Sequence, residues 1–329
     1  MMDRRAFIGA AAPGLLALPL AAGAQPAGKL RRIGFLGSGS MPAAASLIEA
    51  FRQGLRERGW VEGRNIVIDF RFADGKFDRL PELAAELVRL EPDLIFSVPT
   101  PATLAAAKTT KTIPIVMIGV GDPVALGLVA SLARPGGNVT GLSSGVGPEI
   151  IGKQLQLLKE TLPKVSKVAV LSNPANAGHA PWIGNAKISA QSLGLQAQFL
   201  EARGPDEFDG AFAAMGKERA GAVLIFGDPM FSDHYPRLAD LAARHRLPSM
   251  HFLRGAVPAG ALMSYGPDLS DQHRRIADFV DKILKGARPA ELPVEQANRF
   301  TLAFNRKTAK ALGITIPQTV LLRADEVIE

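Results

Sequence analysis

The pattern GLSSG at residues 141–145 is the stretch of this sequence that most resembles a catalytic motif. In G-x-S-x-G enzymes the serine sits on a sharp turn between a strand and an immediately following helix, and it needs a histidine and an acid as partners. Here Gly147 and Pro148 separate Ser143 from the next helical pattern, and no histidine is identifiable as its partner. We therefore interpret the segment as a turn and keep a cleft hydrolase as an alternative.

Metal and cofactor motifs do not emerge from the remaining reactive residues. The chain has five histidines, and none of them forms the H-E-x-x-H spacing of zinc enzymes. It has no cysteine, which excludes disulfides and thiolate sites. The segment GSGSMP at 37–42 lacks the last glycine of the dinucleotide fingerprint, and there is no Walker A sequence. We therefore expect no metal, no cofactor and no catalytic residue, and a protein that is not an enzyme.

Small, hydroxylated, amide-bearing and acidic residues gather instead where predicted strands end. In open parallel sheets, ligands bind beyond the carboxyl ends of the strands. The strand-end segments are GSGSMP (37–42), VPTPAT (98–103), GVGDP (119–123), SNPANAG (172–178), FGDPMF (226–231) and HFLRG (251–255). If two lobes face each other, one cleft collects all of them. The predicted ligand-binding residues are Ser38, Ser40, Thr100, Ala102, Thr103, Asp122, Asn173, Asp228, Phe231 and Tyr265.

These residue types suit a small charged ligand. Helices that begin right after GSGSMP and PTPAT would aim free N–H groups and positive dipole ends into the cleft, where carboxylates or phosphates bind. Asp228, on the opposite wall, could pair with an ammonium group. Phe231, Phe252 and Tyr265 could line an apolar space, and Trp182 is a further candidate for the cleft. A small zwitterion would satisfy this set; the alternative is that the residues only form turns and caps.

Alternating strands and helices must position these residues. The 329 residues, 47% hydrophobic and 21% charged, suit a folded protein of two domains. Strand patterns such as 31–37 and 113–120 alternate with helical ones such as 45–59, and the series restarts near residue 150. Such alternation indicates parallel sheets covered on both faces, so we predict an α/β fold of two doubly wound lobes. Ser270 is placed to cap a helix over 271–286, and residues 314–329 have the pattern of a tail.

The N-terminus predicts an export signal. Arg4 and Arg5 precede Phe7 and an apolar run that prolines interrupt and that is too short to span a bilayer. We expect a signal of the twin-arginine type over residues 1–24, removal after Ala24, and a periplasmic monomer. The net charge is +7, but lysines and arginines are scattered, so we expect no nucleic-acid partner.

Long strings of the sequence resemble the ABC-transporter substrate-binding proteins of the tryptophan/tyrosine-uptake type. They are FRQGLRERGWVEGRNIVIDFRFADGKFDRLPELAAELV, DPVALGLVASLARPGGNVTGLS, VAVLSNPAN, MSYGPDLSD, ILKGARPAELPVEQ and KTAKALGITIP. The resemblance implies the type I periplasmic-binding-protein fold, with two lobes joined by a multi-strand hinge. It also implies a small-molecule solute and an ABC permease at the inner membrane as partners.

Carried over by position, the resemblance also assigns individual segments. The first lobe would comprise 25–141 plus 266–297, and the second 142–265 plus 298–329. The stretch 121–141 would place Asp122 at the cleft rim, Ala125–Ala133 on a helix and Gly141 near the hinge. We thus predict a periplasmic solute-binding protein of an ABC importer, which captures a small carboxylate-bearing solute, an amino acid or an aromatic acid, by clamshell closure. A ligand-sensing module is a further alternative.

Overall fold

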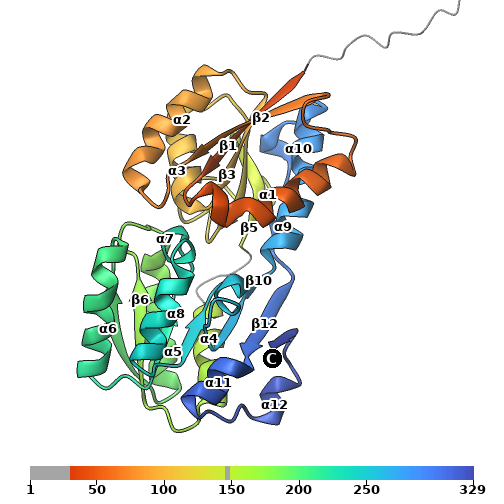
Figure 1. The fold of residues 1–329 in the computed structure, drawn as a ribbon. Helices are drawn as coiled ribbons and strands as arrows, with labels where there is room; N and C mark the ends of the chain where they lie inside the picture. The colour runs from red at the N-terminus through yellow and green to blue at the C-terminus, as the bar shows by residue number, and fades with distance from the viewer. Residues whose placement is uncertain (1–29, 145–148) are drawn as a thin grey trace, which may run out of the picture.

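Two β-sheets, each covered by helices on both faces, form two lobes that lie one above the other in Figure 1. The computed structural model describes residues 30–144 and 149–329, so the export signal predicted over 1–24 lies outside the described residues. Within these two ranges, no helix combines the length and the apolar content that crossing a bilayer requires. The predicted α/β fold of two lobes is confirmed.

The first lobe has a six-stranded sheet in the order β11-β5-β4-β3-β1-β2, with every pairing parallel. Successive strand residues point to opposite faces, so Phe35 packs in the apolar cluster under α1 and α10, and Leu36 packs in the cluster under α2 and α3. The elements are β1 (Arg31–Gly37), α1 (Met41–Arg56), β2 (Ile66–Phe72), α2 (Leu80–Arg89), β3 (Leu94–Val98), α3 (Thr100–Thr109), β4 (Ile115–Val120), β5 (Val139–Ser143), α10 (Ala277–Leu284) and β11 (Glu295–Gln296).

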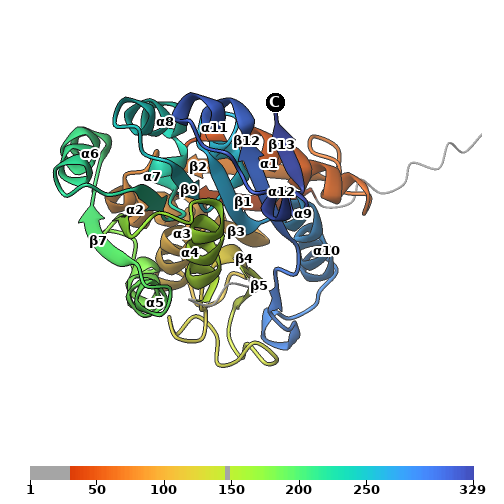
Figure 2. The ribbon, with the colours of Figure 1, turned by 90° about the horizontal axis from the view of Figure 1, so that it is seen from below.

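The second lobe has a seven-stranded sheet in the order β13-β12-β10-β9-β8-β6-β7. All pairings are parallel except β10 with β12, a departure from the predicted all-parallel sheets. Its elements are α4 (Glu149–Thr161), β6 (Lys167–Ser172), α5 (His179–Ser192), β7 (Gln196–Glu201), α6 (Phe208–Lys217), β8 (Ala222–Ile225), α7 (Pro229–Ser232), α8 (Tyr235–Arg244), β9 (Ser249–His251), β10 (Met263–Pro267), β12 (Phe300–Asn305), α11 (Arg306–Leu312), α12 (Gln318–Leu321) and β13 (Glu326–Ile328). Seen from below in Figure 2, α4 and α5 lie on one side of this sheet, and α6 and α8 lie toward the other.

The C-terminal tail predicted over 314–329 is wrong, because these residues contribute to the second lobe. Val320 of α12 is buried in the apolar cluster that also holds α4 and α5. Strand β13 pairs with β12 from Ala303 to Asn305 and forms the edge of the sheet. Strand β13 is hard to predict from the sequence, because three residues are too few to show the alternation of apolar and polar residues that marks a strand.

Two local helix predictions are also wrong. Residues 125–133 form turns in place of a helix: the N–H groups of Leu128 and Val129 both bond to the Pro123 carbonyl, and Gly127 takes a left-handed φ of 67°. The helix after β10 is capped by Asp268, whose side chain accepts a hydrogen bond from the Asp271 N–H, and not by Ser270. That helix divides into α9 (Leu269–Arg275) and α10 at Ile276.

The chain passes between the two sheets three times. It leaves the first sheet after Ser143, returns after Pro267 and crosses again after Gln296. The returning helices α9 and α10 lie beside α1 in the first lobe, far from it in sequence (Figure 1). Their packing is close, since a Cβ on Gly54 of α1 would lie 2.2 Å from the Arg274 carbonyl oxygen.

Candidate functional site

A cavity of about 670 Å³ lies between the two lobes and is lined by residues of both. Five of the six predicted strand-end segments contribute to its wall, as the rule for parallel sheets requires. The sixth, SNPANAG at 172–178, lies behind the wall, where Asn173 and Asn176 hydrogen-bond to Asp228. The start of α9, from Leu269 to His273, and the crossover residue Ser144 complete the lining.

The first lobe supplies two serines at the amino end of α1. Ser38 is fully buried, lines the cavity, and its hydroxyl has no hydrogen-bond partner among the described residues. Ser40 is the N-cap of α1, and its hydroxyl accepts a hydrogen bond from the Ala43 N–H at 3.4 Å. A helix of 16 residues starting here brings a positive dipole end to this wall. The arrangement can therefore receive a negatively charged ligand group.

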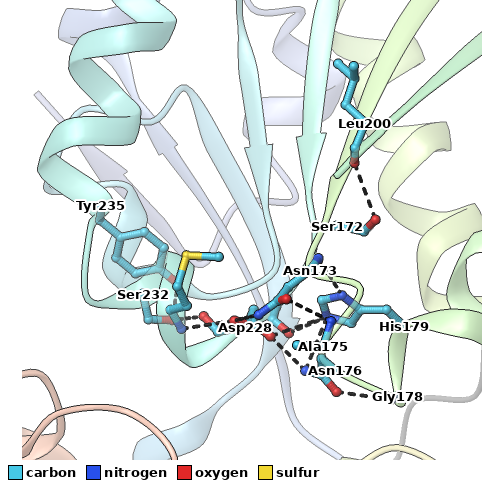
Figure 3. Close-up of polar contacts among 12 residues, drawn as sticks. Ser172, Asn173, Ala175, Asn176, Gly178, His179, Leu200, Asp228, Ser232 and Tyr235 are labelled. Carbon is cyan, nitrogen blue, oxygen red and sulfur yellow. Dashed lines mark hydrogen bonds and ion pairs between the residues drawn. The ribbon is translucent and has the colours of Figure 1, made fainter. Parts of the chain in front are cut away.

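The second lobe supplies Asp228, whose carboxylate is held by three donors (Figure 3). Its Oδ1 accepts from Asn173 Nδ2 at 3.1 Å and from the Met230 N–H at 3.0 Å, and its Oδ2 accepts from Asn176 Nδ2 at 2.8 Å. Asp228 is 2% exposed. As N-cap of α7, it ties the SNPANAG loop to the end of β8. Most of its capacity to accept hydrogen bonds is thus used inside the protein.

His179 joins the same network as a neutral ring. Its Nδ1 accepts from the Asn173 N–H at 3.1 Å, so Nε2 carries the proton and donates to the Gly227 carbonyl at 3.1 Å. Burial lowers the pKa of His179, and the negative charge of Asp228, 3.9 Å away, only partly opposes this effect. Both ring nitrogens therefore have structural partners, and His179 positions the loop in its neutral form.

Asp233 connects the two walls of the cavity. Its Oδ1 accepts a hydrogen bond of 3.2 Å from the Ser40 hydroxyl of the opposite lobe. Gly39 lies beside the same carboxylate, since a Cβ there would be in van der Waals contact with this oxygen at 3.4 Å. Burial in the cleft raises the pKa of Asp233, and its hydrogen bonds with Ser40 lower it in part. The carboxylate is half-buried and lies directly on the cavity.

Aromatic rings form the apolar part of the lining. Trp182 and Phe252 pack with ring centroids 4.9 Å apart on the second lobe. Phe72 lies on the first lobe beside Phe35, at 5.4 Å. Such rings provide a flat apolar surface for a small organic ligand, with the serines and carboxylates at its edge.

Of the ten residues predicted to bind ligand, Ser38, Ser40 and Asp228 line the cavity. Thr103 is buried behind it, where its hydroxyl bonds to Ser97 Oγ at 2.9 Å and donates to the Pro99 carbonyl at 3.1 Å. Thr100 and Ala102 are buried on α3, and Asn173 bonds to Asp228 as described. These four residues support the wall from behind.

The remaining predicted residues lie elsewhere. Asp122 is exposed and accepts hydrogen bonds from the N–H groups of Val124 and Ala125, as a turn cap does. Phe231 is 1% exposed and packs against Phe208 in the core of the second lobe. The ring of Tyr265 stacks on Phe300 with centroids 6.0 Å apart.

Several lining residues were not predicted from the sequence. Asp233 follows the predicted segment FGDPMF by two residues, and the short helix α7 brings it back to the cavity. Asp268 and His273 belong to the chain's return to the first lobe. The capping pattern PDLSD at 267–271 is a sequence signal that could have located this helix start at Asp268.

The structure also bears on two other kinds of site, a hydrolase serine at Ser143 and a metal site. The hydroxyl of Ser143, at the end of β5, donates to the Glu295 carbonyl at 3.4 Å, as a strand-end residue would. Across residues 30–144 and 149–329, no three acidic or histidine side chains gather closely enough to bind a metal ion.

Comparisons with known proteins show to which family the chain is related. Residues 36–328 match the family described as ABC transporter substrate binding protein. A tyrosine-binding protein of Clostridioides difficile is 28% identical over 87% of this chain and 82% of its own length. The structure of an ABC domain from Streptococcus pneumoniae in complex with L-Trp is 28% identical, with a TM-score of 0.84 over 91% of this chain and 99% of that one.

A third relative has been solved without a ligand. The ligand-free, open structure of a substrate-binding protein from Clostridium difficile is 27% identical over 91% of this chain and 99% of that one, with a TM-score of 0.66. The family match extends over nearly the whole of the described chain, through both lobes and the cavity between them. This protein therefore belongs to the ABC transporter substrate-binding protein family.

Proposed function

We propose that this protein captures a small carboxylate-bearing solute, an amino acid or an aromatic acid, in the periplasm and delivers it to an ABC permease. The observation that carries the proposal is the cavity of about 670 Å³ whose wall comes from both lobes. A ligand held there contacts more protein when the lobes are together than when they are apart. Such differential affinity shifts the balance toward the closed state, which a permease can then recognise.

The arrangement of the lobes supports clamshell closure. At nearly equal sequence identity, the chain superimposes better on the L-Trp complex, with a TM-score of 0.84, than on the ligand-free, open relative, with 0.66. The hydrogen bond from Ser40 to Asp233 joins the two lobes across the cleft. We take the three crossovers after Ser143, Pro267 and Gln296 as the hinge.

The chemistry of the first-lobe wall favours a carboxylate. Ser38 offers a buried hydroxyl that no described protein group engages, beside the amino end of α1. The two relatives described as binding tyrosine or L-Trp take ligands with this group. The aromatic lining around Trp182 and Phe252 suits an apolar or aromatic side chain.

A thermal-shift screen tests the proposal. Purified protein is heated with each of the twenty amino acids and with benzoic, phenylacetic and indole-3-acetic acids. A ligand at about 100 times its Kd should stabilise the folded state by about 2.7 kcal/mol and raise the Tm by a few degrees. We expect at least one compound to do so and its amide or methyl ester to fail. A screen in which no carboxylate raises the Tm would contradict the proposal.

A further inference from the structure

The charged side chains that line the cavity differ in whether they have a hydrogen-bond or ion-pair partner within the protein. Among the described residues, its lining contains the carboxylates of Asp228, Asp233 and Asp268 and the guanidinium of Arg254. Arg254 pairs with Glu326 at 2.7 Å, and its side chain is 60% exposed. His273 is buried, and this burial lowers its pKa to about 4, so its ring is neutral at pH 7. The cavity wall is therefore acidic on balance.

Two of the three carboxylates already have their partners. Asp228 accepts hydrogen bonds from Asn173, Asn176 and the Met230 N–H. Asp268 caps α9 through the Asp271 N–H and lies 3.5 Å from Arg299 Nε. Each of these two carboxylates thus caps the start of a helix. A ligand could bind to either one only by displacing these capping hydrogen bonds.

Asp233 differs from both. Within residues 30–144 and 149–329, Asp233 takes part in no ion pair with a lysine or arginine, and the hydrogen bonds to its side chain come from Ser40. Asp74, on the opposite lobe, adds a negative charge nearby, although it is paired with Arg79 at 2.8 Å. His234 adjoins Asp233 on the second lobe. A half-buried carboxylate without a cationic partner is costly, and an arriving cation would relieve that cost.

We infer that Asp233 is the residue that binds the ammonium group of the solute, and that the solute is therefore an α-amino acid. This inference rests on the proposed function of the cavity. Ser38, two residues before Ser40, offers the free hydroxyl for the carboxylate, and Ser40 reaches Asp233 at 3.2 Å. The two charged groups of an α-amino acid are held on one carbon atom, which suits subsites this close together. Asp233 lies on the second lobe and Ser38 on the first, so one solute would link both.

Matched ligand pairs test this role. Calorimetric titration compares L-tryptophan with indole-3-propionic acid, L-tyrosine with 3-(4-hydroxyphenyl)propionic acid, and L-leucine with 4-methylpentanoic acid. Each second compound lacks only the ammonium group. We expect the wild type to bind at least one amino acid tenfold or more tightly than its partner. In Asp233→Asn this preference should fall below threefold, chiefly by loss of amino-acid affinity.

Two further variants separate Asp233 from its surroundings. Asp206→Asn makes the same change at an exposed position of the second lobe outside the lining, and it should keep the wild-type preference. Asp228→Asn should weaken both members of a pair equally, because that carboxylate is used internally. A preference that survives in Asp233→Asn, or is lost in Asp228→Asn with Asp233 intact, would overturn the inference.

The two proposals can fail separately. If the acids without an ammonium group bind as tightly as the amino acids or more tightly, the assignment of Asp233 is wrong and the capture of a carboxylate solute stands. If neither member of any pair binds, and the thermal-shift screen also finds no carboxylate, the proposed function and this inference fall together.

Discussion

Ser40 and Asp233 are separated by 193 residues in sequence, yet the Ser40 hydroxyl donates a hydrogen bond of 3.2 Å to Asp233 Oδ1 from one lobe to the other. Ser40 also caps α1, so a plain loss of the hydroxyl would weaken the helix. Glycine is a good N-cap, and Ser40→Gly therefore removes the bridge with little effect on the helix. The hydrogen bond joins the two lobes, so under the proposed closure it should favour the closed state.

Ser40→Gly is expected to weaken solute binding about fivefold, since such a hydrogen bond contributes about 1 kcal/mol and 1.4 kcal/mol is a factor of ten. Calorimetric titration with the best compound from the screen measures the change. Ser40→Thr keeps both the hydroxyl and the cap and serves as the matched control. Affinity that is unchanged in Ser40→Gly would show that the bridge does not stabilise the liganded state.

Asp228→Ala should lower the free energy of unfolding by about 3 kcal/mol, because it leaves the buried amides of Asn173 and Asn176 and the Met230 N–H without an acceptor. Urea unfolding followed by circular dichroism gives this value. Asp206→Ala, at an exposed position, should change stability by less than about 0.5 kcal/mol. Equal stability of the two variants would mean that the carboxylate of Asp228 is free for another purpose.

Stability should fall as the pH drops from about 6.5 to 5. Burial lowers the pKa of His251 to about 3 and that of His273 to about 4, and it also lowers the pKa of His179. Unfolded histidines have a pKa near 6.5, so below that pH the unfolded chain binds more protons than the folded one. In this range, each fully buried histidine should lower the free energy of unfolding by about 1.4 kcal/mol for each unit by which the pH falls.

Urea midpoints measured between pH 7 and pH 5 check this slope. Carboxyl groups with lowered pKa values, such as Glu57 and Glu218, lose their stabilising charge only at lower pH, so they do not contribute here. His251→Gln should remove one histidine's share of the slope. A midpoint that is constant from pH 7 to pH 5 would contradict the assignment of neutral buried rings.

Two helical glycines should respond in opposite ways to alanine. A Cβ on Gly54 would lie 2.2 Å from the Arg274 carbonyl oxygen and would push α9 away from α1, which we expect to cost about 2 kcal/mol. A Cβ on Gly184 of α5 would meet nothing within 4 Å, and the better helix propensity of alanine should stabilise the protein by about 0.5–1 kcal/mol. Thermal unfolding of both variants measures the difference, and a stabilised Gly54→Ala would disprove the close packing of α1 on α9.

Much of the fold follows from patterns that are local in the sequence. The alternating strands and helices predict both lobes, and the rule for strand ends brings Ser38, Ser40 and Asp228 to the cavity. Edge strand β13 could not be predicted from local patterns, because it is short and because its pairing with β12 depends on the folded sheet. The stretch 125–133 has the apolar content of a helix, but Gly127 and Pro123 organise it into turns.

The orientation of single side chains depends on tertiary structure. Phe231 and Tyr265 have residue types suited to a cleft, but the twist of α7 and the pairing of β10 turn their rings toward Phe208 and Phe300. Asp233 belongs to no recognisable sequence motif; α7 brings it to the cavity, and its hydrogen bond with Ser40 depends on how close the two lobes lie. Such cross-lobe relationships are set by the hinge and by the packing of α9 on α1, which no single segment encodes.

Small-angle X-ray scattering tests most directly whether the solute draws the lobes together. The radius of gyration of the purified protein is measured alone and with a saturating amount of a compound identified in the thermal-shift screen. We predict a smaller radius of gyration and a shorter maximum dimension with the compound, and a reduced change in Ser40→Gly. An unchanged radius of gyration at saturation would contradict closure around the solute.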